Sequence, residues 1–315
     1  MTICMAVICE EGKAAICATD RMVTHHGLSV QFEHAQPKIT ALTPQCCAMT
    51  AGSALSHTDI LEQVQGSLAS LRDPLIAQAV RSVKEAYQQA RMEELIEHYL
   101  IPRGIRDIAH FLELHGRLDQ VIAAAIQYEI DSFDYGVEII ISGISQEVAH
   151  IYSIGNPGVS ARFDALGFHA IGSGLPHATN SLIARGCNRD LRLLESLMIV
   201  TEAKIMAEKA PGVGSDTDMC ILSSRGCVSM NPAQFDLMRP IYQRWAQGNP
   251  MWENEAQTLL QDISGRNEID GQPRTEAPRT EPPIAGRGTR EVSGTHAGSN
   301  AALSAEGAGA PANQG

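Results

Sequence analysis

Runs of apolar residues at the start of the chain alternate with short polar breaks and predict a series of β-strands. Residues 3–9 and 14–18 form two such runs, and Gly12 lies between them where a tight turn is needed, so we expect an antiparallel pair. Another strand is predicted after Pro37, and the mostly small residues of segment 46–54 predict the strand that follows it. The first part of the chain is therefore expected to be mainly β-structure.

A polar stretch interrupts this pattern between the second and third predicted strands. It contains His25, His26 and Gly27, and His34 follows shortly after. Imidazoles in a polar loop are usually solvated. We therefore expect a loop here, without metal ligands.

The chain then changes to helical periodicity. Ser56 is expected to begin a capped helix, and Asp73-Pro74 a second one, because proline is favoured in the first turn of a helix. We expect these two helices to cover one side of the first sheet. A short extra helix is predicted at about 105–114, and residues 121–128 continue the helical pattern.

The second half of the chain repeats the alternation of strands and helices. The expected elements are paired strands at 137–144 and 148–154, a strand region at 162–171, helices at about 176–186 and 191–209, and a hairpin of 219–222 with 227–230. The order of sheet, two helices, sheet, two helices predicts an α+β protein built in four layers.

The C-terminal part has a different composition. Trp252 is the last aromatic residue, and from Gly265 onward small, polar and charged residues dominate. Such a segment cannot bury enough apolar surface to offset the entropy lost on ordering. The sequence thus predicts a folded domain over residues 2–264 and a disordered low-complexity tail over residues 265–315, with a tether to a partner as the functional alternative.

Composition narrows the classes of function. The chain has 315 residues, 44% of them hydrophobic, and a net charge of −12, which argues against a general nucleic-acid or anionic-membrane surface. Its eight cysteines include no Cys-x-x-Cys pair, so we expect small buried hydrophobic residues in a reducing compartment, with no metal and no cofactor. No signal peptide or membrane span is recognised, and a cytoplasmic protein is expected.

The second residue offers candidate chemistry. Initiator methionine is removed readily when a small residue follows it, and the new chain end would then be Thr2. A hydroxyl and a free α-amine on one residue combine a nucleophile with a base, since an α-amine has a reference pKa of about 8. Taken alone, however, a threonine at this position is more often an ordinary strand residue.

Several motifs follow Thr2 in a particular order. They are the Gly12 turn, Asp20-Arg21, Lys38, Ala51-Gly52-Ser53-Ala54 before a helix, Ala170-Ile171-Gly172-Ser173-Gly174 before another helix, and Pro211-Gly212-Val213-Gly214 before the strand at 218–222. Over roughly residues 2–230, this ordered set resembles the proteasome β-type family of N-terminal nucleophile hydrolases.

The resemblance implies a fold and a set of site residues. The fold would be a four-layer αββα sandwich, with two sheets face to face and helices outside. Thr2 would be the nucleophile, Lys38 would lie beside its hydroxyl, Asp20 would pair with Lys38, and the Gly52 backbone N–H would point at the developing oxyanion. Ser173 is either a polar member of the site or only the hydrogen-bonded serine of a glycine-rich turn.

The chain departs from the family pattern near the N-terminal amine. Many proteasomal β subunits carry an Asp and a Ser before the closing strand and a second Ser after the Gly-Ser-Gly motif. The corresponding positions here are Ala210, Val213 and Leu175, and the nearby Ser215 and Asp216 do not align cleanly. Bacterial two-component peptidases, the partners of ring-shaped ATP-dependent unfoldases, also lack the Asp-Ser pair. The bacterial-type branch, which includes the ancestral β-like subunits, is therefore the better comparison.

The resemblance implies a threonine-type endopeptidase that hydrolyses unfolded polypeptides. It would act inside a self-compartmentalised homo-oligomeric ring, with an ATP-dependent unfoldase as a further partner. Two alternatives stay open: an amidase of the wider superfamily that acts on small amides, and a catalytically inactive subunit that builds or caps an assembly. The lack of a long segment before Thr2 disfavours the self-cleaving amidases, whereas the missing Asp-Ser pair keeps the inactive subunit open.

Overall fold

The two N-terminal apolar runs form the predicted hairpin. In the computed structural model, which describes residues 2–25, 30–52, 56–72 and 74–270, β1 (Cys4–Cys9) and β2 (Ala14–Asp20) pair antiparallel. Gly12 has a φ of 86°, a value that glycine adopts without steric cost, and so allows the reversal between the strands. Every residue of both strands is buried, which explains why they appear as continuous apolar runs without alternation.

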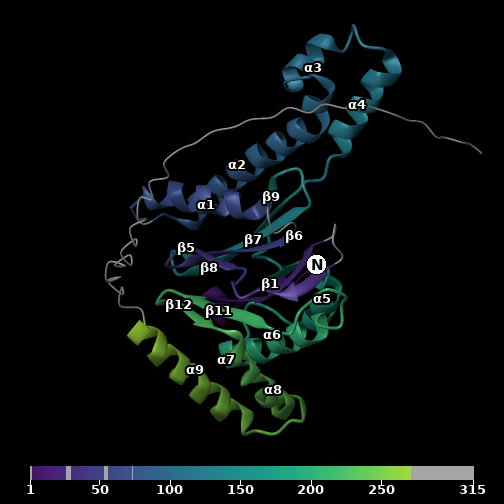
Figure 1. The fold of residues 1–315 in the computed structure, drawn as a ribbon. Helices are drawn as coiled ribbons and strands as arrows, with labels where there is room; N and C mark the ends of the chain where they lie inside the picture. The colour runs from purple at the N-terminus through teal and green to yellow at the C-terminus, as the bar shows by residue number, and fades with distance from the viewer. Residues whose placement is uncertain (1, 26–29, 53–55, 73, 271–315) are drawn as a thin grey trace, which may run out of the picture. The chain divides into compact units, whose positions relative to one another are not determined.

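Two five-stranded sheets account for most of the β-structure (Figure 1). The first has the order β10-β1-β2-β11-β12, and its later strands are β10 (Phe168–Ile171), β11 (Thr217–Ser223) and β12 (Gly226–Met230). The second contains, in order, β5 (Ile39–Thr43), β6 (Cys46–Gly52), β7 (Val137–Ser145), β8 (Val148–Gly155) and β9 (Val159–Arg162). The protein is thus a mixed α+β fold in which each sheet draws strands from both halves of the chain.

The helices pack on the two sheets in pairs. The pair α1 (Ser56–Ala69) and α2 (Ile76–Leu95) shares a core with the sheet of β5–β9, and the pair α5 (Leu175–Ala184) and α6 (Leu193–Ala207) shares a core with the sheet of β1 and β2. A third apolar cluster, with residues such as Ile8, Met49 and Ile140, lies between the two sheets. The expectation that the first two helices cover the sheet of the first strands is therefore correct for β5 and β6 and wrong for β1 and β2, because these two pairs of strands belong to different sheets.

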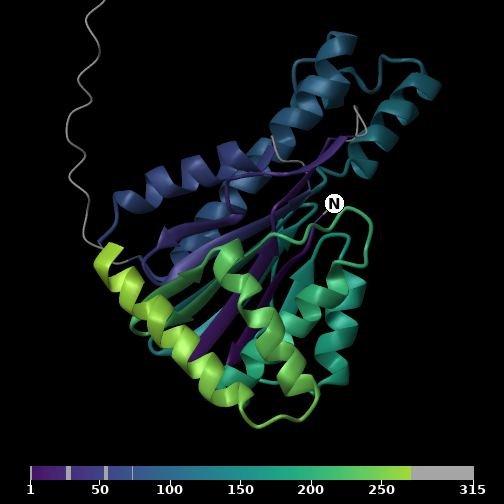
Figure 2. The same ribbon diagram turned by 60° about the horizontal axis from the view of Figure 1, so that its bottom comes forward.

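The remaining helices include one short turn between β1 and β2, a group between α2 and β7, and a group after β12. They are η1 (Glu10–Gly12), η3 (Ile96–Leu100), η4 (Ile101–Arg103), α3 (Ile108–Leu114), α4 (Gln120–Ser132), α7 (Pro232–Asp236), α8 (Met238–Ala246) and α9 (Trp252–Asp270). In Figure 1, α3 and α4 lie beyond the end of α2, away from the two large sheets, whereas Figure 2 shows α8 and α9 beside the sheet that contains β11 and β12.

Two strand predictions need correction. The predicted polar loop forms a separate two-stranded sheet of β3 (Met22–His25) and β4 (Val30–Glu33), while His26 and Gly27 lie outside the described residues. The single strand region predicted at 162–171 is divided, since β9 ends at Arg162 and β10 begins at Phe168 in the other sheet.

The end of the described chain is helical. Helix α9 continues to Asp270, six positions beyond the predicted end of the folded domain at residue 264, and residues 271–315 lie outside the described part. Among the described residues, no helix is long and apolar enough to cross a membrane.

Candidate active site

Strand pairing places Thr2 against a glycine-rich turn that is distant in sequence. Thr2 precedes β1 and is 3% exposed, and its carbonyl oxygen accepts a hydrogen bond from Gly174 N at 3.1 Å. Gly172 has a φ of +90°, and a Cβ atom there would lie 2.4 Å from the Thr2 carbonyl oxygen. Because any larger residue would collide with that backbone, the glycine is explained by its approach to Thr2.

Asp20 ends β2 beside Thr2 and is fully buried. Its Oδ1 accepts hydrogen bonds from the Thr2 hydroxyl and from Ile3 N at 3.0 Å. Its Oδ2 accepts from Met22 N at 3.2 Å and from Gly214 N at 2.9 Å. A buried carboxylate needs such donors to compensate for lost hydration, and here backbone N–H groups hold both oxygens in place.

Lys38, directly before β5, supplies the matching positive charge. Its ammonium donates to the Thr2 hydroxyl oxygen, to Asp20 Oδ1 at 2.9 Å and to the Met22 carbonyl oxygen at 2.5 Å. Its side chain is only 13% exposed, so the ion pair with Asp20 is weakly screened by solvent. The structure therefore brings together Thr2, Asp20 and Lys38.

Ser173 also lies at Thr2. Its Oγ accepts a hydrogen bond from Thr2 N at 3.1 Å and lies 3.4 Å from two carbonyl oxygens, those of Thr2 and Pro211, to which its hydroxyl can donate. Of the two interpretations of Ser173, this contact favours a polar member of the site.

Gly52 ends β6 on the other side of the site. Its φ is +110°, and a Cβ atom would lie 1.9 Å from the Gly136 carbonyl oxygen, so only glycine fits. Gly52 lines the same cavity as Thr2 and Lys38. The role of its N–H group as an oxyanion donor stays a prediction.

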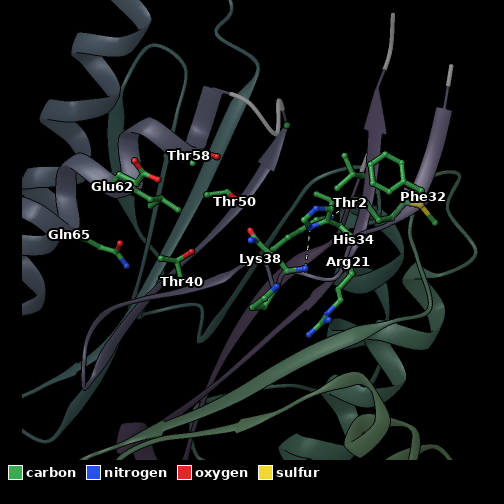
Figure 3. Close-up of a pocket in the computed structure, with 16 residues that line it drawn as sticks. Thr2, Arg21, Phe32, His34, Lys38, Thr40, Thr50, Thr58, Glu62 and Gln65 are labelled. Atoms are coloured by element: carbon green, nitrogen blue, oxygen red, sulfur yellow. Dashed lines mark hydrogen bonds between the residues drawn. The ribbon is translucent and has the colours of Figure 1, made fainter. Parts of the chain in front are cut away.

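A cavity of about 400 Å³ adjoins these residues. Figure 3 shows that it extends from Thr2 and Lys38 toward α1, where Thr58, Glu62 and Gln65 lie. Its remaining lining residues are Arg21, Met22, Val23, Phe32, His34, Gln36, Pro37, Thr40, Thr50, Gly52 and Leu61. The site is thus open on one side to a pocket large enough for a long side chain.

Sequence reasoning missed a network behind Asp20. Lys204 on α6 is fully buried, and its ammonium donates to the Gly214 carbonyl oxygen and to Glu208, each at 2.8 Å. Burial lowers the pKa of Lys204. The Gly214 N–H in turn donates to Asp20, so Lys204 positions a donor of that carboxylate. The position of Lys204 within an apolar helical segment could have indicated a buried charge. Its contact with Gly214, ten residues later, could not be predicted from helical periodicity.

The structure also describes the positions at which the sequence differs from the proteasomal β pattern, and the polar residues near them. Ser215 N and Asp216 N donate to the Glu33 carboxylate on β4, at 2.7 and 3.2 Å, so these two residues are joined to the β3–β4 sheet. Ala210 and Val213 are buried in the core of the first sheet. Leu175, the third departing position, begins α5 and packs against the same core. Among the described residues, Ser173 supplies the hydroxyl that contacts the Thr2 nitrogen.

Seven of the eight cysteines are buried, and Cys227 is exposed. Burial raises the pKa of Cys46 to about 12, as expected for a thiol that stays protonated. The sequence did not indicate that Cys17, Cys47 and Cys220 would meet, yet their sulfur atoms lie within 4.8 Å of one another between the two sheets. Three thiol ligands are thus available there. Hydrogen bonds from Cys220 and Cys47 lower the pKa of Cys17, whereas their hydrogen bonds with Cys17 raise the pKa of Cys47 and of Cys220.

Sequence comparison does not assign the chain to a family, since no protein-family model and no curated protein matches it. Any function assigned to it therefore depends on the arrangement around Thr2.

Proposed function

We propose that the chain is an N-terminal threonine peptidase, an endopeptidase of the proteasome type that cleaves unfolded polypeptides after Met1 has been removed. The observation that carries the proposal is the contact of one hydroxyl, that of Thr2, with both Lys38 and the buried Asp20. The two sheets, with a shared apolar core and a helix pair on each, are compatible with the αββα sandwich of N-terminal nucleophile hydrolases.

The proposed reaction has two steps. Thr2 Oγ attacks the peptide carbonyl carbon, and its proton passes to the free Thr2 amine, directly or through a water. When the C–N bond breaks, this proton goes to the leaving amine, and the acyl group stays on Thr2 as an ester. Water then attacks the ester, the acid product leaves, and the Thr2 hydroxyl is restored.

The neighbouring charges favour the attack. The Lys38 ammonium, in contact with the Thr2 oxygen, stabilises negative charge as the proton departs. Lys38 also disfavours protonation of a nearby amine by like-charge repulsion. Asp20 fixes the direction of the Lys38 ammonium through their 2.9 Å ion pair.

Oxyanion stabilisation and substrate binding are assigned to the strands that border the cavity. The Gly52 N–H is the proposed oxyanion donor, and one such donor typically contributes about 3 to 4 kcal/mol to lowering the barrier. The substrate would lie extended between the β3 region and the end of β6, since residues 21–23, Thr50 and Gly52 all line the cavity. In the described part of the chain, β3 pairs only with β4, so one edge of β3 has no strand partner.

The test is covalent labelling of the native protein. Intact-mass analysis is expected to show a chain that begins at Thr2, and a threonine-directed peptide epoxyketone is expected to add one equivalent to it. Thr2→Ala should abolish the adduct, whereas Thr258→Ala on the exposed face of α9 should leave it unchanged. A chain that retains Met1, or an adduct that survives Thr2→Ala, refutes the proposal.

The two alternatives give different outcomes in the same experiment. An amidase would form the Thr2 adduct and hydrolyse small acyl-amides, but would not cleave an unfolded polypeptide such as casein. An inactive subunit would assemble without forming the adduct. A homo-oligomeric ring and an ATP-dependent unfoldase remain part of the proposal as partners. A ring would enclose the Thr2 sites and keep folded proteins away from them, and an unfoldase would supply unfolded chains.

A further inference from the structure

Among the charged residues that line the cavity beside Thr2, Glu62 has no counter-ion within the described part of the chain. Arg21 forms a two-point pair with Asp218 at 2.6 and 2.7 Å, and Lys38 is paired with Asp20 at 2.9 Å. Glu62 of α1 has neither an ion pair nor a hydrogen bond with any residue that the structure describes. The cationic groups that line the cavity are therefore neutralised, and its uncompensated charge is negative.

Glu62 lies on the face of α1 that borders the cavity. Thr58, Glu62 and Gln65 are spaced by four and three residues, which places them on one side of the helix, and Figure 3 shows them together at the end of the cavity away from Thr2. Gln65 donates its amide N–H to the Ala41 carbonyl oxygen at 2.9 Å, so its amide oxygen is left as an acceptor. Two acceptors, one of them charged, thus face the same space.

The lining of the cavity is partly apolar. Met22, Val23, Pro37 and Leu61 contribute to the lining, and Leu61 is buried. A side chain that reaches from Thr2 toward α1 would place its polar end near Glu62 and its aliphatic stem beside apolar lining such as Leu61, which precedes Glu62 in α1. Arginine and lysine combine such a stem with a cationic end.

We propose that the cavity binds an arginine side chain on the residue whose carbonyl Thr2 attacks, so that the enzyme cleaves after arginine. This inference rests on the proposed peptidase function. A guanidinium presents five N–H donors in a planar fork and can donate to the Glu62 carboxylate and the Gln65 amide oxygen together. A lysine ammonium has the same charge but cannot donate to both acceptors in one plane. We therefore expect a lysine peptide to bind less tightly than an arginine peptide.

A binding experiment tests the pocket without turnover. Two peptides that differ only by arginine or its neutral isostere citrulline at the terminal residue are titrated into the Thr2→Ala protein. We expect the arginine peptide to bind about fivefold more tightly, as for an ion pair with an exposed carboxylate such as Glu62. Adding Glu62→Gln should reduce the ratio to about twofold or less, because the neutral amide keeps the shape and removes the charge.

Asp59→Asn is the matched control. It removes one carboxylate from the same helix at an exposed position that does not line the cavity, so it should preserve the preference for arginine. Equal binding of both peptides, or a preference that Glu62→Gln leaves intact, overturns the inference.

A turnover experiment separates the two proposals. Fluorogenic peptides ending in arginine, citrulline, leucine or glutamate before the reporter are compared on wild type and Glu62→Gln. Thr2-dependent cleavage without a preference for arginine overturns the pocket assignment and leaves the peptidase proposal standing. Arginine-selective binding with no cleavage of any peptide supports the pocket and contradicts the peptidase.

Discussion

At the scale of single residues, the main feature of the Thr2 site is the buried carboxylate of Asp20. Asp20 is fully buried, and Lys38 is its ion-pair partner. Removing one member of a buried pair typically costs about 3 to 5 kcal/mol, because the other charge is left uncompensated. The backbone donors to Asp20, from Ile3, Met22 and Gly214, reduce the desolvation cost that remains and make its orientation independent of Lys38.

Ser173→Ala tests how the Thr2 amine is held. The Ser173 hydroxyl accepts from Thr2 N, and an acceptor stabilises an ammonium more than a neutral amine. We expect kcat/KM to fall about 10-fold and the acidic limb of its pH profile to move to lower pH. A role limited to folding would reduce the rate without moving that limb.

The control for Ser173 is Ser181→Ala. Ser181 is a buried serine of α5 whose hydroxyl has no partner within the described structure, so its loss should not change the pH profile. If both variants gave the same profile as wild type, Ser173 would not position the amine.

At the scale of elements, the short strand β10 joins the glycine-rich turn to β1. His169 of β10 faces Ala6 across the strand pair and stacks on Phe163, with ring centroids 3.7 Å apart. Burial lowers the pKa of His169 to about 4, so the native strand carries a neutral imidazole. We therefore expect acid to destabilise the strand that leads to Ser173.

We expect the stability of the protein to fall between pH 7 and pH 5. The unfolded chain, with an ordinary histidine pKa near 6.5, binds a proton in this range that native His169 does not, so stability decreases as pH decreases. The loss from this residue should be about 1 to 2 kcal/mol at pH 5. Urea unfolding at both values checks it, and His169→Phe should remove this part of the change; an equal loss in the variant would contradict the assignment.

At the scale of the whole molecule, α3 and α4 carry several large exposed apolar side chains. Leu112 of α3 is 62% exposed, and Val121, Ile122 and Tyr128 of α4 are 77%, 53% and 72% exposed. Val121 and Tyr128 are seven residues apart and therefore lie on one face of α4, and exposed apolar residues that lie together often mark a protein contact. We expect this surface to contact another copy of the chain in the proposed ring.

Light scattering coupled to size exclusion checks this expectation. The double variant Val121→Ser with Tyr128→Ser should elute at a lower mass than wild type, while Val159→Ser, an exposed apolar residue of β9, should not change the mass. An unchanged assembly in the double variant would place the subunit contacts elsewhere.

The sequence by itself determined the local elements and part of the site. Turn glycines, helical periodicity and apolar runs predicted the β1–β2 hairpin, α1 and the last hairpin, because these depend on contacts between near neighbours. The order of Thr2, Asp20 and Lys38 likewise indicated residues that the fold brings together.

The tertiary structure decided how the strands are shared between the sheets and what surrounds Thr2. Strands buried on both faces show no alternation, so their sequence does not reveal which strand or sheet adjoins them. Ser173 meets the Thr2 nitrogen across 171 positions, and Gly214 meets Asp20 across 194. Such contacts arise only when β10 and β11 pair with the N-terminal hairpin, which depends on burial in the whole core rather than on any local pattern.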